Sequence, residues 1–169
     1  GGPIFGGDIA STQDENASFT VHALATPPAT GAIKRHGAKC GDAVCITGEL
    51  GNANESHHLS FTPRIDIAKE LAMTLKDGLH SMIDISDGLG QDASHLASRE
   101  LQIVIQTNLL PLRRGATIQN ALCDGEDYEL LFTCTVEPTL QDVTVIGYVQ
   151  TREPDSPLVI DEDANDLSQ

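Results

Sequence analysis

The chain has 169 residues, of which 40% are hydrophobic, and it carries ten Lys and Arg against 25 Asp and Glu, a formal net charge of −15. This hydrophobic content is enough to fill a core, so a wholly disordered chain is excluded. The acidic excess argues against nucleic acid or an anionic membrane as a partner, because both are bound through basic surfaces. It leaves open an anionic ligand that arrives with divalent cations, which carboxylates bind.

The sequence contains no run of about 18 apolar residues, the length that a membrane-spanning helix needs. A secretion signal, with a basic start followed by an apolar stretch, is not visible either. The four cysteines form no Cys-x-x-Cys pair and are too few for a disulfide-stabilised secreted domain. These features predict a cytoplasmic protein with reduced thiols.

Apolar patterning predicts the first elements in chain order. Residues 19–25 are predicted as a strand that ends before two prolines, and residues 43–47 as a short buried strand that ends at a glycine. Residues 48–63 combine Gly, Asn, His and Pro without a period and are predicted to be irregular. A helix is predicted over residues 64–77, because apolar residues recur there every four positions and a glycine follows.

The middle of the chain repeats this order of strand and helix. Residues 79–85 are predicted to be extended, and a second helix is predicted over residues 88–99 from its apolar face. Residues 101–105 are predicted as a strand, and residues 117–122 fit a short helix after a loop.

Two further strands are predicted at residues 129–136 and 143–148, with an edge strand at residues 158–160. Strands and helices are therefore interleaved without strict alternation. This order predicts the α+β class, a mixed β-sheet with helices packed on it, over a doubly wound parallel fold.

Three segments combine glycine with carboxylates, and the first is Gly6-Gly7-Asp8. Two glycines let the backbone approach a ligand closely, and the carboxylate beside them can bind a hard cation. The alternative is an ordinary turn, which the same residues form equally well.

The second segment runs from Ile83 to Leu89 and includes Asp84, Ser86 and Asp87. With the isoleucines facing the core, Asp84 and Ser86 share the other face of the strand, and Asp87 follows at the turn. Mg²⁺ usually takes one or two carboxylates together with waters and phosphate oxygens, which this cluster offers. The alternative is a helix cap, which explains one polar residue and not an aspartate at the end of a buried strand.

The third segment places Asp124, Glu126, Asp127 and Glu129 directly before an apolar strand. Strands disfavour acidic residues, so this run predicts a polar loop that presents its side chains to a cation or to donors on a ligand. A solvated turn would account for one or two of these acids.

Phosphate chemistry by other routes has little support in the sequence. Neither a Gly-x-x-x-x-Gly-Lys-Ser/Thr loop nor a Gly-x-Ser-x-Gly elbow is present, which argues against a P-loop kinase and against a serine nucleophile. Lys34-Arg35 is the best local cationic candidate for a phosphate contact, and a solvated loop pair is the alternative.

Taken together, these motifs resemble the thiamine-monophosphate kinase family, within the superfamily of aminoimidazole ribonucleotide synthetase and selenophosphate synthetase. The matching stretches occur in the family's order along nearly the whole chain: Gly6-Gly7-Asp8, residues 34–42, residues 46–51, residues 83–89 and residues 125–132. The run Gly-Glu-Asp-Tyr-Glu-Leu is the most specific of them.

The resemblance implies transfer of the γ-phosphate of ATP to thiamine monophosphate, giving thiamine diphosphate, with Mg²⁺ as cofactor and no assigned catalytic base. It implies that Asp8, Asp84 and Asp87 bind Mg²⁺. It implies that Gly7, Arg35 and Ser86 contact ATP, and that Glu126 contacts the thiamine substrate.

The resemblance also implies a domain organisation. Residues 1–26 would be the end of an amino-terminal ATP-binding domain, residues 27–160 a carboxy-terminal domain and residues 161–169 an acidic tail. The activity would then belong to a longer cytoplasmic, homodimeric parent, with this segment inactive alone. Two alternatives remain: another ATP-dependent enzyme of the same superfamily, or a non-catalytic acidic domain that only binds a partner or a metal.

Overall fold

The computed structural model describes residues 24, 26–27, 31–55 and 57–168. The predicted strand at 19–25 falls almost wholly outside these residues, and so do Gly7 and Asp8. The division of the chain into residues 1–26, 27–160 and 161–169 therefore stays a prediction.

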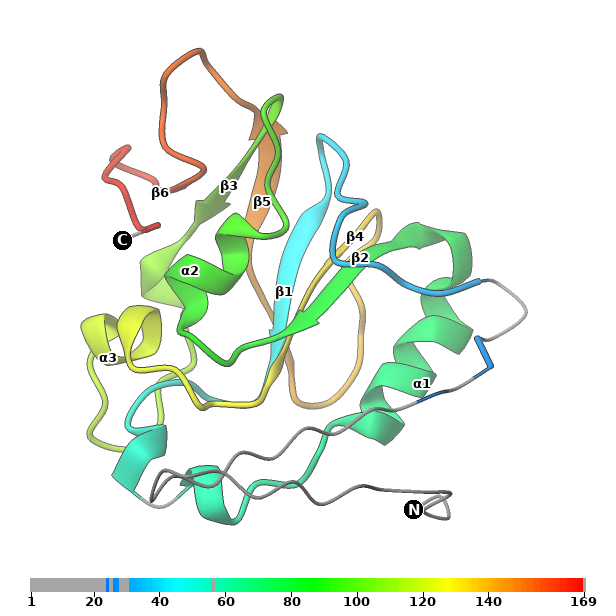
Figure 1. Ribbon diagram of the computed structural model, residues 1–169, viewed down its shortest axis with the longest axis vertical. Helices are drawn as coiled ribbons and strands as arrows, with labels where there is room; N and C mark the ends of the chain where they lie inside the picture. Colours follow the sequence, from blue (N-terminus) through cyan, green and yellow to red (C-terminus); the bar gives the residue numbers. More distant parts are fainter. Residues whose placement is uncertain (1–23, 25, 28–30, 56, 169) are drawn as a thin grey trace, which may run out of the picture.

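Within the described residues, six strands form one sheet in the order β2-β4-β1-β5-β3-β6 (Figure 1). Neighbouring strands are antiparallel except β3 and β6, which are parallel, so the predicted mixed sheet is confirmed. The bounds of the strands follow the predicted apolar runs: β1 Ala43–Thr47, β2 Leu79–Asp84, β3 Leu101–Ile105, β4 Leu130–Cys134, β5 Val143–Thr151 and β6 Val159–Asp161.

The longest helix of the described residues is α1, Ile65–Leu75, which is followed by a 3-10 turn over Lys76–Gly78. The helix was predicted to end before Gly78. The short helix α3, Ile118–Cys123, begins with a capping box in which the hydroxyl of Thr117 accepts from the backbone N–H of Asn120. In the described part of the chain, no helix is long and apolar enough to cross a membrane.

The second predicted helix is shorter than the sequence pattern indicated. Helix α2 covers only Leu89–Ser94, whereas the periodicity predicted residues 88–99. The chain turns instead, because the N–H of Ser98 donates to Leu101 O and the hydroxyl of Ser98 accepts from the N–H groups of Glu100 and Leu101. Such side-chain bonds to the backbone compete with helix hydrogen bonds.

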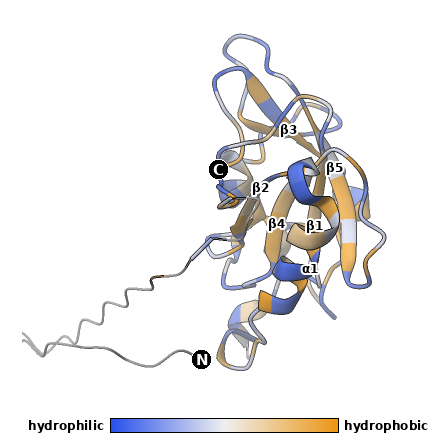
Figure 2. Ribbon diagram, turned by 90° about the vertical axis from the view of Figure 1, so that its right-hand side faces the viewer, coloured by the Kyte–Doolittle hydropathy of each residue, from blue (hydrophilic) through white to orange (hydrophobic). Residues whose placement is uncertain are grey.

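The sheet separates two clusters of buried apolar side chains. Val44 and Ile46 of β1 point toward α2 and α3, and Cys45 between them points toward α1 with Phe132 and Leu71. In Figure 2 the strands β1, β4 and β5 are largely hydrophobic, while α1 carries hydrophilic and hydrophobic residues side by side. Burial on both faces explains why the strands read as nearly continuous apolar runs.

The residues after β6 return to this core. The N–H of Leu167 donates to Val159 O at 3.0 Å, and the Leu167 side chain packs against the cluster beneath α2. The carbonyl oxygen of Leu167 lies so close to Gly90 that a Cβ at Gly90 would overlap it. The end of the chain therefore covers one side of α2.

Gly147 is the tightest point of the sheet centre, because an added Cβ would overlap the carbonyl oxygen of Val104 in β3. We expect Gly147→Ala to lower the free energy of unfolding by about 2 kcal/mol, the usual cost of overpacking. Urea denaturation measures this change. The control is Gly78→Ala, whose added methyl would meet Thr135 at an ordinary 4.0 Å; equal losses in both variants would contradict the expectation.

Candidate active site

The site is built where β2 ends and β4 begins. These strands are antiparallel neighbours with Asp84 opposite Leu130, so the loop after β2 lies beside the loop before β4, as Figure 1 shows. Three backbone hydrogen bonds of 2.8 Å join the loops: Ile85 N to Glu129 O, Tyr128 N to Ile85 O, and Glu126 N to Ser86 O. Two segments predicted separately as functional therefore form one structure.

The first loop presents two carboxylates to solvent. Asp84 and Asp87 are exposed and Ser86 is half-buried, while Ile85 is fully buried in the core. The predicted alternation of the strand into core and polar faces is confirmed in this segment. Both carboxylates are therefore accessible to a cation or a ligand, and Oδ2 of Asp87 also accepts from Gln91 Nε2 at 3.4 Å.

The buried carboxylate of Asp92 holds this loop, although no sequence motif had indicated it. Its Oδ2 accepts from the N–H of Ser86 at 2.8 Å and from the N–H of Asp87 at 2.9 Å. The signal was an aspartate three residues after Leu89, on the face of α2 that is turned to the core. An acid at such a position needs a local donor, and the two amides provide it.

Burial raises the pKa of Asp92 above its ordinary value. The hydrogen bonds from the amides of Asp87 and Ser86 act in the opposite direction, and the negative charges of Asp87 and Asp84 add to the rise. Three carboxylates thus act on one another at this end of the sheet. A bound cation would relieve this repulsion.

The exposed carboxylates of Asp84 and Asp87 suit Mg²⁺, which also binds water and phosphate oxygens, better than a metal whose ligands all come from the protein. In the described part of the chain, no group of three or more His, Cys, Asp or Glu could hold a metal ion. Asp84 and Asp87 offer two hard oxygen donors, and Mg²⁺ ordinarily completes its shell with water and phosphate oxygens. Asp8, the third predicted ligand, lies outside the described residues.

The acidic loop is only partly as predicted. Asp127 and Glu129 were expected to face a ligand, and this expectation is wrong, because both are buried and bind arginines of the chain. Oδ1 of Asp127 accepts from Arg113 Nη1 at 2.6 Å and from Gly51 N at 3.0 Å. Glu129 receives two bonds of 2.6 Å from Arg64 and one of 2.5 Å from the hydroxyl of Thr47.

These two ion pairs shape the neighbouring surface. A cavity of about 440 Å³ is lined by Arg64, Arg113 and Glu129, together with His57 and the loop at Gly48. The pKa of Arg64 is raised by its hydrogen bond to Glu129. Both guanidinium groups are therefore held in place by buried acids.

Glu126 and Asp124 are the acids of this loop that are only half-buried, and Glu126 is the one predicted to contact the substrate. It lies at a positive φ of 56°, its side chain is 44% exposed, and its Oε2 is 4.0 Å from Nδ1 of His58. Two residues on, the ring of Tyr128 stacks on Phe61 with centroids 4.4 Å apart. Glu126 can thus accept hydrogen bonds from a ligand that lies beside the stacked rings.

The predicted site residues divide into two groups. Asp84, Ser86, Asp87 and Glu126 are brought together by the paired loops. Arg35 is exposed on the segment that runs beside the middle of β2, where Lys34 O accepts from Met82 N at 3.1 Å.

Comparison with known proteins gives a consistent set of relatives, although no protein-family model matches the chain. The thiamine-monophosphate kinase of Rhodopirellula baltica is 32% identical over an alignment of 145 positions, which covers 79% of this chain and 44% of that protein. The thiamine-monophosphate kinase of Aquifex aeolicus is 34% identical over 155 residues, with shares of 72% and 49%. The chain thus spans about half the length of the curated relatives it matches.

Solved structures agree with this result. AaThiL complexed with AMPPCP and TMP superimposes with a TM-score of 0.65 at 34% identity, covering 79% of this chain and 51% of that one. The hydrogenase maturation protein HypE in complex with ATP superimposes with a TM-score of 0.54 at 16% identity, over 70% and 45%. The second likeness shows a shared fold alone.

Proposed function

Because the chain is a homologue of thiamine-monophosphate kinases over about half of their length, we propose that it is part of an enzyme that phosphorylates thiamine monophosphate. ATP would give its γ-phosphate, and thiamine diphosphate would be the product. The observation that carries the proposal is the pairing of the loop at Ser86 and Asp87 with the loop at Glu126. This pairing supports the proposal because it joins the loop that carries Asp87 to the loop that carries Glu126.

The roles proposed for the residues follow from what each exposes. Asp84 and Asp87, with Asp8, would hold Mg²⁺, which neutralises phosphate charge when bound. Ser86 would contact the phosphates of ATP, as would Gly7 and Arg35. Glu126 would accept hydrogen bonds from the thiamine substrate, next to the Tyr128 and Phe61 rings.

The chemistry needs little more from this chain than positioning. In-line phosphoryl transfer proceeds through charge neutralisation and alignment, so it requires no covalent nucleophile. Asp92 serves this end by fixing the amides of Ser86 and Asp87 from behind. The active protein is further proposed to be a longer chain, in keeping with the half-length match to the kinases, and to be a cytoplasmic homodimer.

The proposal is tested first by turnover. Phosphorylation assays with ATP, Mg²⁺ and thiamine monophosphate are performed on the protein at its full length. We expect thiamine diphosphate to form. Absence of turnover with thiamine monophosphate, alongside intact nucleotide binding, would instead support another ATP-dependent activity.

The metal site is tested by calorimetry with Mg²⁺ and a non-hydrolysable ATP analogue. We expect Asp84→Asn and Asp87→Asn each to weaken binding of the metal–nucleotide complex about tenfold, equivalent to about 1.4 kcal/mol. The matched control is Asp66→Asn, an exposed acid on α1 that loses the same charge. Titrations that do not differ from wild type would remove the metal assignment. An equal loss of binding in the control would show that the effect comes from the net charge of the protein and not from a metal site.

A further inference from the structure

A second cavity lies at the opposite end of β2 from the candidate active site. It has a volume of about 280 Å³ and is enclosed by the segment 31–39, the turn that ends α1 and the start of β2. Its charged and titratable lining residues are Lys34, His36, Lys39, Lys76, Asp77 and His80. None of Arg35, Ser86, Asp87 and Glu126 is among the residues that line it.

The cavity is lined mainly by positively charged residues, whereas the chain as a whole is negatively charged. The chain has four lysines, and all except Lys69 line the cavity. Asp77 is the one carboxylate among the lining residues, in a protein with a net charge of −15. Clustered cations on a concave surface concentrate positive potential and attract anions.

One of the lining residues is a buried histidine that is held by a hydrogen bond. The side chain of His80 is 9% exposed, and its Nδ1 lies 2.8 Å from Oδ2 of Asp42, whose side chain is 3% exposed. A carboxylate can only accept, so the hydrogen in this contact is on Nδ1 of His80. Nε2 lies 2.8 Å from Nζ of Lys39, so the lysine donates to the ring.

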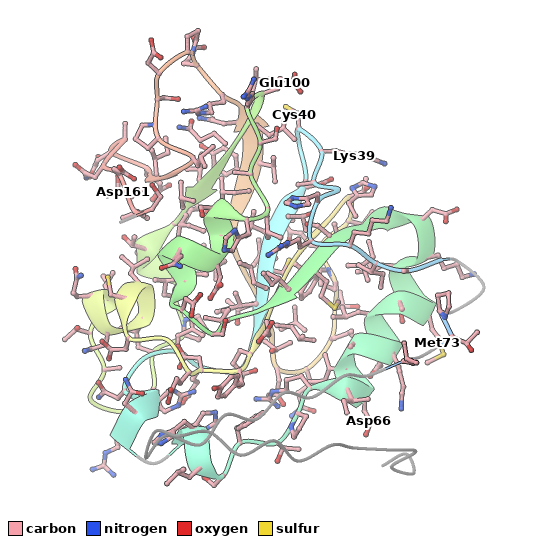
Figure 3. All side chains as sticks on the ribbon, viewed as in Figure 1. Lys39, Cys40, Asp66, Met73, Glu100 and Asp161 are labelled. Carbon is pink, nitrogen blue, oxygen red and sulfur yellow. The ribbon has the colours of Figure 1, made fainter. Side chains whose placement is uncertain are left out.

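The same aspartate also fixes the backbone of Lys39, whose N–H donates to Oδ2 of Asp42 at 2.8 Å. Both ends of Lys39 are thus positioned by buried groups. In Figure 3 its side chain extends from the loop before β1 toward the side of the molecule where β2 begins. Asp42 does not itself line the cavity, so its charge lies behind the histidine.

Lys76 adds an independent sign that the cavity has a function. It has φ 48° and ψ −123°, a conformation that side-chain-bearing residues rarely adopt and glycine adopts freely. Strain of this kind is kept where a side chain is needed and is concentrated at binding sites. A lysine at this position brings a third ammonium group to the cavity.

We propose that this cavity binds a phosphate dianion, either inorganic phosphate or the phosphate of a small monoester. Lysine binds phosphate as a point charge, and three ammonium groups match a compact, highly charged anion. The volume lies below the range of roughly 300–1,000 Å³ typical of drug-sized ligands, which favours a small ion over a nucleotide. The metal ligands proposed for the kinase, Asp84 and Asp87, do not line this cavity, and the proposal does not depend on the kinase function.

The test is a titration of the chain with inorganic phosphate in the presence of EDTA, followed by calorimetry and by the NMR signals of the His80 ring. We expect saturable binding with a Kd on the order of 1 mM. We expect Lys39→Gln to weaken it at least fivefold. The control is Lys69→Gln, which removes a 66%-exposed lysine paired with Asp66 outside the cavity. Absence of saturation, or an equal loss in the control, would overturn the proposal.

Lys76→Gly separates binding from folding, because the two properties are expected to change in opposite directions. Glycine relieves the backbone strain, so Tm should rise while phosphate binding weakens at least fivefold. Unchanged phosphate binding in this variant would overturn the role of Lys76 and with it the site.

Asp84→Asn should leave the phosphate Kd unchanged, which distinguishes this site from the proposed kinase site. Methyl phosphate, tested beside inorganic phosphate, identifies the source: equal affinity indicates a monoester, and preference for inorganic phosphate indicates the free ion.

Discussion

Replacing Arg113 with methionine is expected to lower the free energy of unfolding by about 3 kcal/mol or more, because it leaves the carboxylate of Asp127 buried without its counter-charge. Asp127 is 0% exposed, and its Oδ2 already has no hydrogen-bond partner among the described residues. Arg113 also donates to Gly51 O and Glu49 O, both at 2.6 Å, so these loops lose a support as well. Urea denaturation at pH 7 measures the change.

Arg114→Met is the matched control, since Arg114 is the exposed neighbour and its loss removes the same charge. We expect the control to change stability by less than about 0.5 kcal/mol, as at most surface positions. The double variant Arg113→Met with Asp127→Asn should regain part of the loss, because no unpaired charge then remains buried. Similar stabilities for Arg113→Met and Arg114→Met would contradict a stabilising ion pair.

The pH dependence of this loss has a definite sign. Burial raises the pKa of Asp127, and the hydrogen bond and charge of Arg113 lower it. Without Arg113, the folded-state pKa rises further above the unfolded value of about 3.9. A carboxyl with a raised folded pKa loses its stabilising contribution as pH increases through that pKa. The Arg113→Met defect should therefore be smaller near pH 4 than at pH 7.

Replacing Asp92 with alanine is expected to lower the free energy of unfolding by about 3 kcal/mol, because two backbone N–H groups lose a charged acceptor. Asp92 is 1% exposed, so water does not readily replace the carboxylate. The loop that carries Ser86 and Asp87 would lose its support, and binding of the metal–nucleotide complex should weaken as well. Urea denaturation and calorimetry measure the two effects on the same protein.

Asp92→Asn is the informative companion, because its amide oxygen can accept the same two hydrogen bonds. We expect it to be less destabilising than alanine and to keep more of the binding. Because burial raises the folded-state pKa of Asp92, wild type should lose stability relative to Asp92→Asn as pH increases from about 4 toward 7. Equal defects in the alanine and asparagine variants would show that the hydrogen bonds to Ser86 and Asp87 are not what Asp92 contributes.

Much of the fold could be predicted because its causes are local. The apolar runs at β1 and β3 and the four-residue period of α1 show directly which residues are buried. The end of α2 could not be read this way, because a turn built by Ser98 interrupts a pattern that would otherwise continue the helix.

The candidate site was predictable to the extent that its residues follow each other in the chain. Asp84, Ser86 and Asp87 lie at the end of one strand, and their exposure follows from the alternation of that strand. Asp92 required knowledge of α2, and the pairing of the loop at Ser86 with the loop at Glu126 required the neighbouring positions of β2 and β4.

By itself, the sequence determined the α+β class, the acidic character of the chain and the order of motifs that connects it to its relatives. Only the tertiary structure decided which acids are available to a ligand. Asp127 meets an arginine 14 residues away and Glu129 one 65 residues away, and the lysines of the second cavity come from two segments that are far apart in the sequence. Local sequence patterns indicate whether a side chain is buried. Its hydrogen-bond or ion-pair partner depends on which distant segment the fold brings beside it.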